Sequence, residues 1–229
     1  MRSFDRALVD GRSIRVRTTD RSDGDFAVTV ATVDIDQRRR RIVDRPWVWL
    51  DQVHGARCIG VDEIGPRNAI GAQADAAFTA AEECALSVQT ADCVPVALWT
   101  DAGVIAAVHA GWRGLAAGVV ESAVSALRSV GQAEVHAFMG PSIGPECYEF
   151  GVEEIGSLVD RFGPSVRSVT TTGRPALDVR AGVRAELARL GVDLVAADET
   201  CTACDDRLFS HRARADAGRQ AMVVWIESS

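Results

Sequence analysis

The sequence predicts an α/β (α+β) fold, a single compact domain in which helices pack outside mixed β-sheets. Short segments rich in valine, isoleucine and alanine recur along the 229 residues and are separated by turn residues, as strands are. Longer segments with the apolar spacing of helices lie between them without strict alternation, which favours mixed sheets. No repeat, low-complexity tract or long linker marks a boundary, so one domain over residues 1–229 is expected.

Eight segments have the apolar and β-branched composition of strands. The segments 94–100 and 103–109 flank Asp101 and Ala102, and this pair is expected to form a hairpin. The expected strands cover residues 13–19, 26–33, 47–50, 85–90, 94–100, 103–109, 134–139 and 220–226.

Three segments have apolar residues at helical spacing, and two of them end at a glycine, which often terminates a helix. The expected helices cover residues 115–131, 152–162 and 175–191. The stretch 163–175 is rich in serine, threonine, glycine and proline, and a surface loop is expected there.

Composition argues against a nucleic-acid or membrane partner. The net charge is −7, and no stretch combines basic clusters with interleaved aromatic residues. The run Arg38 to Arg41 lies among aspartates and is interpreted as a solvated helix face or loop. Asp5 and Asp10 stand where a signal peptide would need its apolar stretch, and six dispersed cysteines fit free thiols, so a cytoplasmic protein is expected. The oligomeric state is left open.

Three motifs place a metal-binding side chain where a strand gives way to a turn. They are QVHG at 52–55, TADCVPV at 90–96 and HAGWRG at 109–114. A thiolate from Cys93 with imidazoles from His54 and His109 would offer two nitrogens and one sulfur, which suit zinc and leave a fourth position open. The spacing alone leaves another interpretation open, in which the histidines are hydrogen-bonded structural residues and Cys93 is a buried thiol.

At these motifs the sequence resembles the laccase-domain family, also called the peptidoglycan-editing-factor or YfiH-like family and named for multicopper polyphenol oxidases. The further matching stretches are GPSIGPECYEFG at 140–151, CTAC at 201–204, FSHR at 209–212 and GRQA at 218–221. The resemblance implies that His54, Cys93 and His109 are the metal ligands. It also implies a fold similar to the cysteine-hydrolase-like fold of certain toxin domains, the CNF/YfiH-like fold.

The N-terminal segment departs from the family pattern. Relatives carry a GGVS turn, an SLNLG stretch and an acidic turn leading to an NR pair, in a segment that helps to line the substrate pocket. Here TTDRSDGDF at 18–26 keeps an arginine, Arg21, as the substrate-binding candidate, while the other features cannot be located. The departure leaves the identity of the substrate open.

The resemblance implies purine nucleoside chemistry: phosphate-dependent cleavage of adenosine, inosine or methylthioadenosine, and deamination of adenosine. Zinc lowers the pKa of a bound water towards neutrality, which suits deamination. A carboxylate must then move protons. The candidates are Asp92, taken as the catalytic residue, and Asp51, Asp75 and Glu146.

Other functions compete with this one. Four histidines cannot supply the ligands of a multicopper laccase, which leaves a single copper centre as the lesser alternative to zinc. The same pocket could also serve an editing factor that acts on peptidoglycan precursors without catalysis. A third alternative is a thiol hydrolase that uses Cys93 or Cys147 with a histidine.

The remaining substrate-binding candidates lie in two of the motifs. The turn at 111–114 precedes an expected helix, so its N–H groups could bind phosphate with Arg113 as a clamp, or the glycines could only permit the turn. Trp112 could stack on a base or pack internally. Ser142, Cys147 and Tyr148 could face the pocket from their loop. Cys201 and Cys204 have zinc-ribbon spacing, but without a second such pair a separate structural zinc is not predicted.

Overall fold

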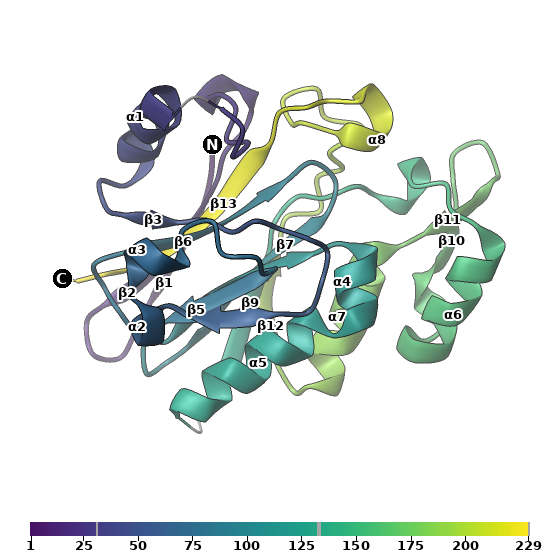
Figure 1. Ribbon diagram of the computed structural model, residues 1–229. Helices are drawn as coiled ribbons and strands as arrows, with labels where there is room; N and C mark the ends of the chain where they lie inside the picture. Colours follow the sequence, from purple (N-terminus) through teal and green to yellow (C-terminus); the bar gives the residue numbers. More distant parts are fainter. Residues whose placement is uncertain (31, 132–133, 229) are drawn as a thin grey trace.

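Two β-sheets lie face to face between two layers of helix in the computed structural model of the chain, which describes residues 1–30, 32–131 and 134–228 (Figure 1). The five-stranded sheet has the order β1 (Arg2–Ala7), β2 (Ser13–Thr18), β13 (Gln220–Glu227), β6 (Ala85–Thr90) and β3 (Trp47–Val48). The six-stranded sheet has the order β12 (Asp193–Ala197), β9 (Val135–Met139), β7 (Val94–Thr100), β8 (Ile105–Ala110), β5 (Ala76–Thr79) and β4 (Cys58–Gly60).

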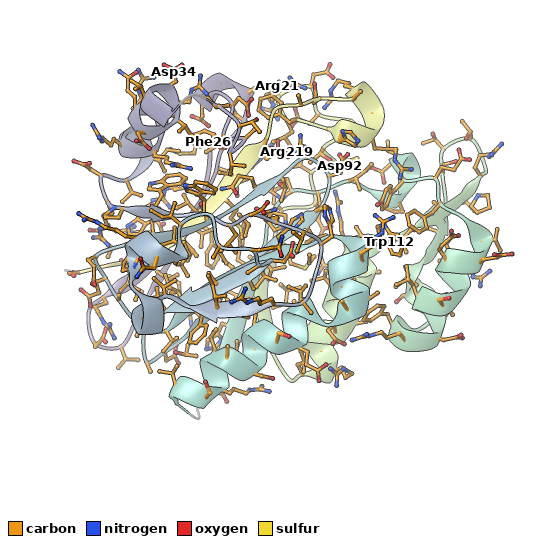
Figure 2. The ribbon with its side chains drawn as sticks, in the orientation of Figure 1. Arg21, Phe26, Asp34, Asp92, Trp112 and Arg219 are labelled. Carbon is orange, nitrogen blue, oxygen red and sulfur yellow. The ribbon has the colours of Figure 1, made fainter. Side chains whose placement is uncertain are left out.

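Side-chain alternation along the strands divides the interior into three apolar layers, because successive residues of a strand point to opposite faces. On β7, Val96 faces the helices and Ala97 faces the other sheet. On β13, Val224 lies between the sheets, whereas Val223 packs towards α1 (Thr32–Ile42). Both central strands are therefore apolar on both faces, as their uninterrupted composition predicts. Figure 2 shows the side chains that fill these layers.

Helices α4 (Trp112–Ala117), α5 (Val119–Val130) and α7 (Val179–Arg189) cover the outer face of the six-stranded sheet (Figure 1). The apolar face of α5 packs there, with Val124 and Leu127 fully buried. The remaining elements are α2 (Val61–Ile64), α3 (Pro66–Ala69), α6 (Val152–Phe162), α8 (His211–Arg214), the 3₁₀ turns Arg21–Asp23, Pro145–Cys147 and Pro164–Val166, and the two-stranded sheet β10 (Arg167–Val169) with β11 (Pro175–Leu177).

The structure confirms the expected strands of both sheet centres, including the β7–β8 hairpin, and corrects four other expectations. The strand expected over 26–33 is wrong in its described part: Phe26 is buried and stacks on Trp47 with ring centroids 5.9 Å apart, the chain turns, and α1 follows. The helix expected over 115–131 begins earlier, at Trp112, and is divided at Gly118, whose φ of 98° lies in the left-handed region. Residues 163–175, expected to be a loop, contain β10.

The helix expected from Pro175 begins later, because Pro175 belongs to β11 and Asp178 caps α7 by accepting a hydrogen bond from Ala181 N at 2.9 Å. The arginine run lies on α1, where Arg40 and Arg41 are exposed but Arg39 is buried with its guanidinium over Trp47. Within the described ranges, the helices are all too short or too polar to cross a membrane.

Candidate metal centre and substrate cavity

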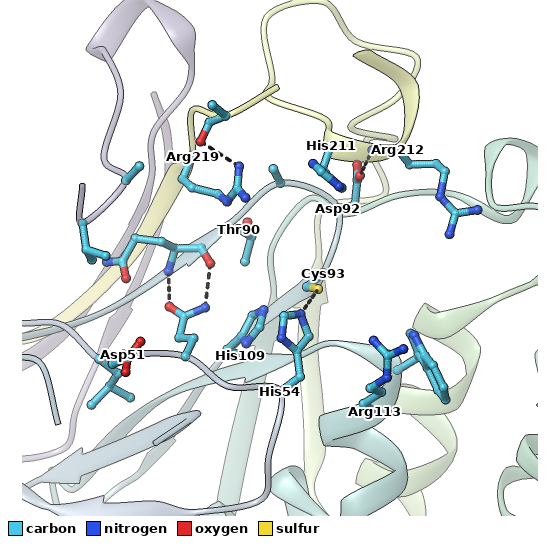
Figure 3. Close-up of a pocket in the computed structure, with 18 of the residues that line it drawn as sticks. Asp51, His54, Thr90, Asp92, Cys93, His109, Arg113, His211, Arg212 and Arg219 are labelled. Carbon is cyan, nitrogen blue, oxygen red and sulfur yellow. Dashed lines mark hydrogen bonds between the residues drawn. The ribbon is translucent and has the colours of Figure 1, made fainter. Parts of the chain in front are cut away.

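Three candidate metal-ligand side chains from distant parts of the chain converge at one end of the sheets. The ligand atoms of His54, Cys93 and His109 all lie within 4.8 Å of one another. Cys93 Sγ lies 3.8 Å from His54 Nε2, and the two imidazole rings meet edge to face (Figure 3). Two nitrogens and one sulfur at this separation could hold one metal ion.

Strand register brings Cys93 and His109 together. Cys93 lies immediately before β7, and His109 is the penultimate residue of the antiparallel neighbour β8, where it pairs with Pro95. The backbone of β8 is fixed on its other side, since His109 N donates to Asp75 O at 2.8 Å next to β5. A rigid hairpin therefore sets the distance between the thiol and this imidazole.

The loop that carries His54 is organised by a buried carboxylate. Asp75 is fully buried, and its two oxygens accept hydrogen bonds from the backbone N–H groups of Val53, His54 and Gly55 at 3.2, 2.9 and 2.7 Å. His54 has a φ of 58°, which costs a non-glycine residue about 1–3 kcal/mol and persists where the surroundings enforce it. The three hydrogen bonds to Asp75 enforce it here.

The same carboxylate orients His109. Its Oδ1 lies 2.8 Å from His109 Nδ1, which must be the donor because a carboxylate only accepts. Nε2 of His109 is thereby left as the nitrogen available to a metal. A carboxylate behind a metal-binding histidine fixes the ring and raises its basicity. Asp75, one of the candidates for proton transfer, therefore has its oxygens engaged behind the site.

Electrostatic coupling within the site favours the thiolate. Burial raises the pKa of the Cys93 thiol, but the charge of His109 and hydrogen bonds from both histidines outweigh it and lower that pKa to about 6. Burial lowers the pKa of His109, yet Cys93 and Asp75 together raise it to about 9. A thiolate is the form of cysteine that binds a metal or attacks an electrophile.

Gly111, the residue before α4, leaves room for two of the ligands. A Cβ at this position would lie 2.7 Å from His54 Cδ2 and 2.9 Å from Cys93 Sγ. Any larger residue would displace one of these side chains, so the first glycine of GWRG is explained by close approach to the site.

The three side chains fit a zinc ion by the chemistry of their donors. Imidazole nitrogen and thiolate sulfur are the donors that zinc prefers, and three of them leave a position open towards the cavity. The other two histidines do not extend the set to a copper cluster: His136 pairs with Asp193 across β9 and β12, and His211 lines the cavity but belongs to neither ligand group found among the described residues.

A cavity of about 550 Å³ opens over the three ligands (Figure 3). This volume is typical of a site for a small molecule. The lining residues named in the sequence analysis are Asp51, His54, Asp92, Cys93, His109, Trp112 and Arg113. Tyr148, expected to face the pocket, also lines it. Sequence reasoning missed a further set, of which His211, Arg212 and Arg219 lie in the quoted motifs FSHR and GRQA, while Gln52, Gln89 and Thr90 were not singled out.

Three arginines in the cavity wall form no ion pair with a carboxylate in the part of the chain that the structure describes: Arg113, Arg212 and Arg219. The guanidinium of Arg113 lies 4.5 Å from the ring centre of Trp112, and that of Arg212 lies 4.6 Å from Tyr148. Arg219 donates to the carbonyl oxygens of residues 216–218 at 2.9–3.0 Å. In a chain with a net charge of −7, such a concentration of uncompensated positive charge favours an anionic ligand.

Asp92 lines the cavity but its carboxylate is engaged elsewhere. Oδ1 accepts from the hydroxyls of Thr202 and Ser210 at 2.7 and 2.6 Å, and Oδ2 accepts from Arg212 N at 2.6 Å. The residue is buried and has a φ of 109°. Asp92 thus fastens the turn before Cys93 to the C-terminal segment.

Three other sequence candidates lie outside the cavity wall as far as the chain is described. Arg21 pairs with Asp216, and its guanidinium lies 4.4 Å from the ring centre of Phe209. Ser142 is fully buried and accepts from Arg180 Nε at 2.9 Å. Cys147 lies beside Cys204 instead, with its neighbour Glu146.

The turn expected to bind phosphate is part of a helix. Residues 112–114 form the first turn of α4, and Leu115 N donates to Gly111 O at 2.8 Å. Trp112 is half-buried and meets Phe150 edge to face, with ring centroids 5.2 Å apart. Arg113 is exposed at the cavity. The phosphate interpretation is therefore supported by the arginine side chains more than by a loop of free N–H groups.

Comparison with known proteins identifies one family model and similar proteins that share a name. The family model described as multi-copper polyphenol oxidoreductase laccase matches residues 19–227. A Mycobacterium tuberculosis protein named purine nucleoside phosphorylase is 42% identical over 184 residues, which cover 79% of this chain and 72% of the relative. A Streptomyces coelicolor protein of the same name is 43% identical over 183 residues, which cover 79% of this chain and 75% of the relative.

Solved structures share the fold. The crystal structure of a Neisseria meningitidis protein matches with a TM-score of 0.82 at 25% identity and covers 99% of both chains. That of Bacillus licheniformis YfiH matches with a TM-score of 0.79 at 22% identity, covering 97% of this chain and 96% of the other. The expected YfiH-like fold of mixed sheets with outer helices is confirmed.

Proposed function

We infer a function for this chain from its family, because it belongs to the multi-copper polyphenol oxidoreductase laccase family. We propose that it is a zinc-dependent purine nucleoside phosphorylase that acts on adenosine, inosine and methylthioadenosine. We also propose that it has adenosine deaminase activity. One observation carries the proposal: the His54, Cys93 and His109 trio shares its cavity with three arginines that have no carboxylate partner among the described residues. A metal-binding group beside an anion-binding wall suits a reaction between a nucleoside and phosphate.

His54, Cys93 and His109 would hold the zinc ion, and Asp75 would hold both histidines in place. When bound, zinc supplies a Lewis acid that can polarise a substrate atom or lower the pKa of water. The carboxylate contributes indirectly: it keeps His109 Nε2 directed away from its own oxygens and keeps the backbone at His54 in the left-handed region.

Arg113, Arg212 and Arg219 would bind the phosphate. In phosphorolysis an oxygen of phosphate attacks C1′ of the ribose, the C1′–N9 bond breaks, and the purine leaves with the bonding electrons and takes a proton. Guanidinium groups orient the phosphate and stabilise its charge while it attacks. The cation–π contacts with Trp112 and Tyr148 hold two of the arginines over the cavity without neutralising them.

Two buried polar atoms in the wall are suited to the nucleoside. Thr90 Oγ1 and Gln89 Oε1 make no hydrogen bond to any described residue, although the two residues are 1% and 7% exposed. Burying a polar group without a partner costs about 1–3 kcal/mol, so a ligand that satisfies both atoms gains affinity. Ribose hydroxyls or the exocyclic amine of adenosine are groups of the right kind.

Replacing Thr90 by valine removes one of these groups and keeps the side-chain shape. We expect the KM for adenosine to rise about tenfold, because one hydrogen bond to the nucleoside is lost, while the zinc content stays the same. Steady-state kinetics with metal analysis measure both. A Thr90→Val enzyme with an unchanged KM would remove Thr90 from nucleoside recognition.

For the deaminase activity, Asp51 is the better-placed acid. Asp51 lines the cavity, and its carboxylate accepts no hydrogen bond from a described residue, whereas that of Asp92 accepts three. Proton transfer needs a carboxylate that is free to exchange a proton. We therefore assign Asp51 to deamination and a positioning role to Asp92.

The proposal is tested with zinc-loaded protein and each of the three nucleosides, with and without phosphate. Chromatography should detect adenine or hypoxanthine only when phosphate is present, and inosine formed from adenosine independently of phosphate. Replacing Arg219 by glutamine should raise the KM for phosphate more than the KM for the nucleoside. Nucleosides left intact at high enzyme concentration would overturn the proposed activity.

A second function is favoured by one observation. A cysteine hydrolase uses a triad in which a carboxylate orients an imidazole and the imidazole contacts a thiolate. Such a triad could be formed by Asp75, His109 and Cys93. Chelation separates the two candidates. A thiol hydrolase would keep its activity without metal and would lose it on alkylation, whereas the proposed zinc enzyme would lose its activity with the metal.

A further inference from the structure

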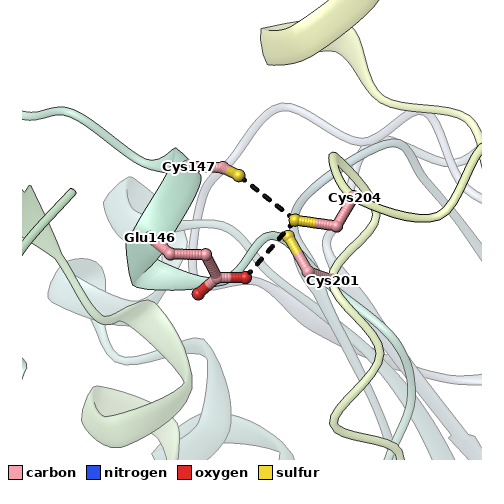
Figure 4. A group of neighbouring side chains, drawn as sticks. All are labelled: Glu146, Cys147, Cys201 and Cys204. Carbon is pink, nitrogen blue, oxygen red and sulfur yellow. Dashed lines mark hydrogen bonds between the residues drawn. The ribbon is translucent and has the colours of Figure 1, made fainter. Parts of the chain in front are cut away.

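A second group of potential ligands lies apart from the cavity. Glu146, Cys147, Cys201 and Cys204 place one carboxylate and three sulfurs within 4.8 Å of one another (Figure 4). Cys204 Sγ lies 3.4 Å from Cys147 Sγ and 3.7 Å from Glu146 Oε1. The group joins two segments distant in sequence: the 3₁₀ turn Pro145–Cys147 and the turn between β12 and α8.

We propose that these four side chains form a second zinc site, with a structural role. Zinc–sulfur bonds of about 2.3 Å in a tetrahedral arrangement place the sulfurs about 3.8 Å apart. The sulfurs of Cys147 and Cys204, 3.4 Å apart, lie slightly closer than that value, and the 4.8 Å upper limit holds for every other pair of ligand atoms. Small side-chain rotations would therefore suffice to close the site around an ion.

The donor set is closed, unlike that over the cavity. Three thiolates and one carboxylate fill the four positions that zinc takes in structural sites. Cys201 is buried and Cys204 is exposed, so the group reaches from the interior to the surface. An ion here would have no position left for a substrate, which makes bracing the fold its role.

The backbone around Cys201 is arranged as in metal-binding turns. Gly144 N donates to Cys201 Sγ at 3.1 Å, and Cys204 N donates to Cys201 O at 3.2 Å within the turn. An N–H donor to sulfur stabilises the thiolate and orients it, as outer hydrogen bonds do for metal ligands generally. Ser142 and Cys201 also form a β-bridge, which fixes the two segments in register.

The spacing of Cys201 and Cys204 alone does not predict this site, because a second pair with the same spacing is absent. In the structure the other two candidate ligands are Glu146 and Cys147, which are adjacent residues in a different loop. Adjacent ligands with one oxygen donor do not match the usual zinc-ribbon pattern. Only the packing of the two loops brings the four together.

The two joined segments also build the cavity wall. The first continues into Tyr148, and the second continues into Ser210 and Arg212, which hold the carboxylate of Asp92. A metal tie between the segments would hold this side of the cavity in place. Its loss should therefore loosen the wall while leaving the His54, Cys93 and His109 trio intact.

Metal analysis of the whole chain, reduced throughout with a phosphine and dialysed after zinc loading, tests the proposal. We expect about two zinc ions per chain, and about one after Cys147→Ser or Cys204→Ser. His109→Ala should also retain about one, held at the second site. Cys58→Ala is the matched control, since that half-buried thiol on β4 lies outside both groups, and it should retain two.

Cobalt gives a readout that does not depend on either enzymatic activity. In a Cys93→Ser protein loaded with Co²⁺, three thiolate ligands at the second site should produce intense sulfur-to-cobalt absorption and a tetrahedral visible spectrum. If the serine variants do not fold, Glu146→Gln in the same Cys93→Ser protein takes their place. It should weaken Co²⁺ binding and leave the fold intact. Thermal unfolding should show a lower Tm for Cys204→Ser than for Cys58→Ala when zinc is present.

One zinc per reduced wild-type chain, lost in His109→Ala and kept in Cys204→Ser, would overturn the second site. A Cys147–Cys204 disulfide found in the reduced, zinc-loaded protein would also overturn it. Neither result would bear on phosphorolysis, which is assayed separately, so failure of this site and failure of the proposed function are distinguishable.

Discussion

Replacing His109 by alanine is expected to empty the metal site over the cavity and to lower phosphorolysis about a thousandfold. A bound Lewis acid contributes several kcal/mol to a transition state, and each factor of ten corresponds to about 1.4 kcal/mol. His109 is 3% exposed and is held by Asp75, so its loss removes the most rigidly placed of the three ligands. Steady-state kinetics and zinc content of the same preparation measure the effect.

His136→Ala is the matched control for this experiment. His136 lies on β9 and pairs with Asp193, outside the cavity, so its replacement should change neither zinc content nor turnover. If His109→Ala lost activity but kept its full complement of zinc, a role for His109 as a base beside Cys93 would be the better explanation. That outcome would favour the thiol hydrolase.

Replacing Asp75 by alanine is expected to destabilise the protein by about 3–5 kcal/mol and to weaken zinc binding about 10–100-fold. The carboxylate is fully buried and accepts hydrogen bonds from three backbone N–H groups and one imidazole. Removing it leaves the loop at His54 without the contacts that enforce its left-handed backbone. Chemical denaturation and zinc titration measure the two effects.

Asp62→Ala is a suitable control, because Asp62 also accepts from a backbone N–H and a hydroxyl, at Ala80 and Thr79, but lies away from the cavity. It should leave zinc affinity unchanged. The stability and the zinc affinity of Asp75→Asn should lie between those of Asp75→Ala and the wild type. An amide keeps the shape of the carboxylate but cannot accept hydrogen bonds at both positions. Wild-type zinc affinity in Asp75→Ala would contradict the assigned positioning role.

The Asp75–His109 pair also predicts how the stability of the zinc-free protein depends on pH. Burial raises the pKa of Asp75, but hydrogen bonds from His109 and the backbone outweigh it and lower that pKa below 3.8. Burial lowers the pKa of His109, but Cys93 first and Asp75 second raise it from 6.5 to about 9. The part of the stabilisation that comes from the Asp75–His109 pair should be complete between pH 3.8 and pH 6.5. It should be lost as the pH falls through the lowered pKa of Asp75 or rises through the raised pKa of His109. Equal pH profiles for the wild type and Asp75→Asn would contradict this coupling.

The N-terminal segment that departs from the family pattern, residues 18–26, can be placed relative to the cavity. Residues 27–29 line the cavity, while Arg21 faces Asp216 and Phe209. The departing segment, 18–26, leads directly into this part of the wall, and Phe26 N donates to Arg219 O at 2.9 Å.

The sequence by itself determined the central strands and indicated three candidate metal ligands. Strands β7, β8 and β13 are apolar on both faces over six to eight residues, and that composition is a local property. His54, Cys93 and His109 stand in recognisable motifs at the ends of such strands. Local composition was sufficient for the strands, whereas the assignment of the ligands also rested on the resemblance to the family.

Only the tertiary structure decided which groups surround those ligands. Strands β4 and β5 are short, and the apolar residues at 26–30 pack beneath α1 instead of pairing, because long-range contacts override local propensity. The role of Asp75 depends on hydrogen bonds to residues 20 to 34 positions away. The unpaired arginines and the Glu146 and cysteine group likewise arise where distant loops meet, and no spacing along the chain encodes that distance.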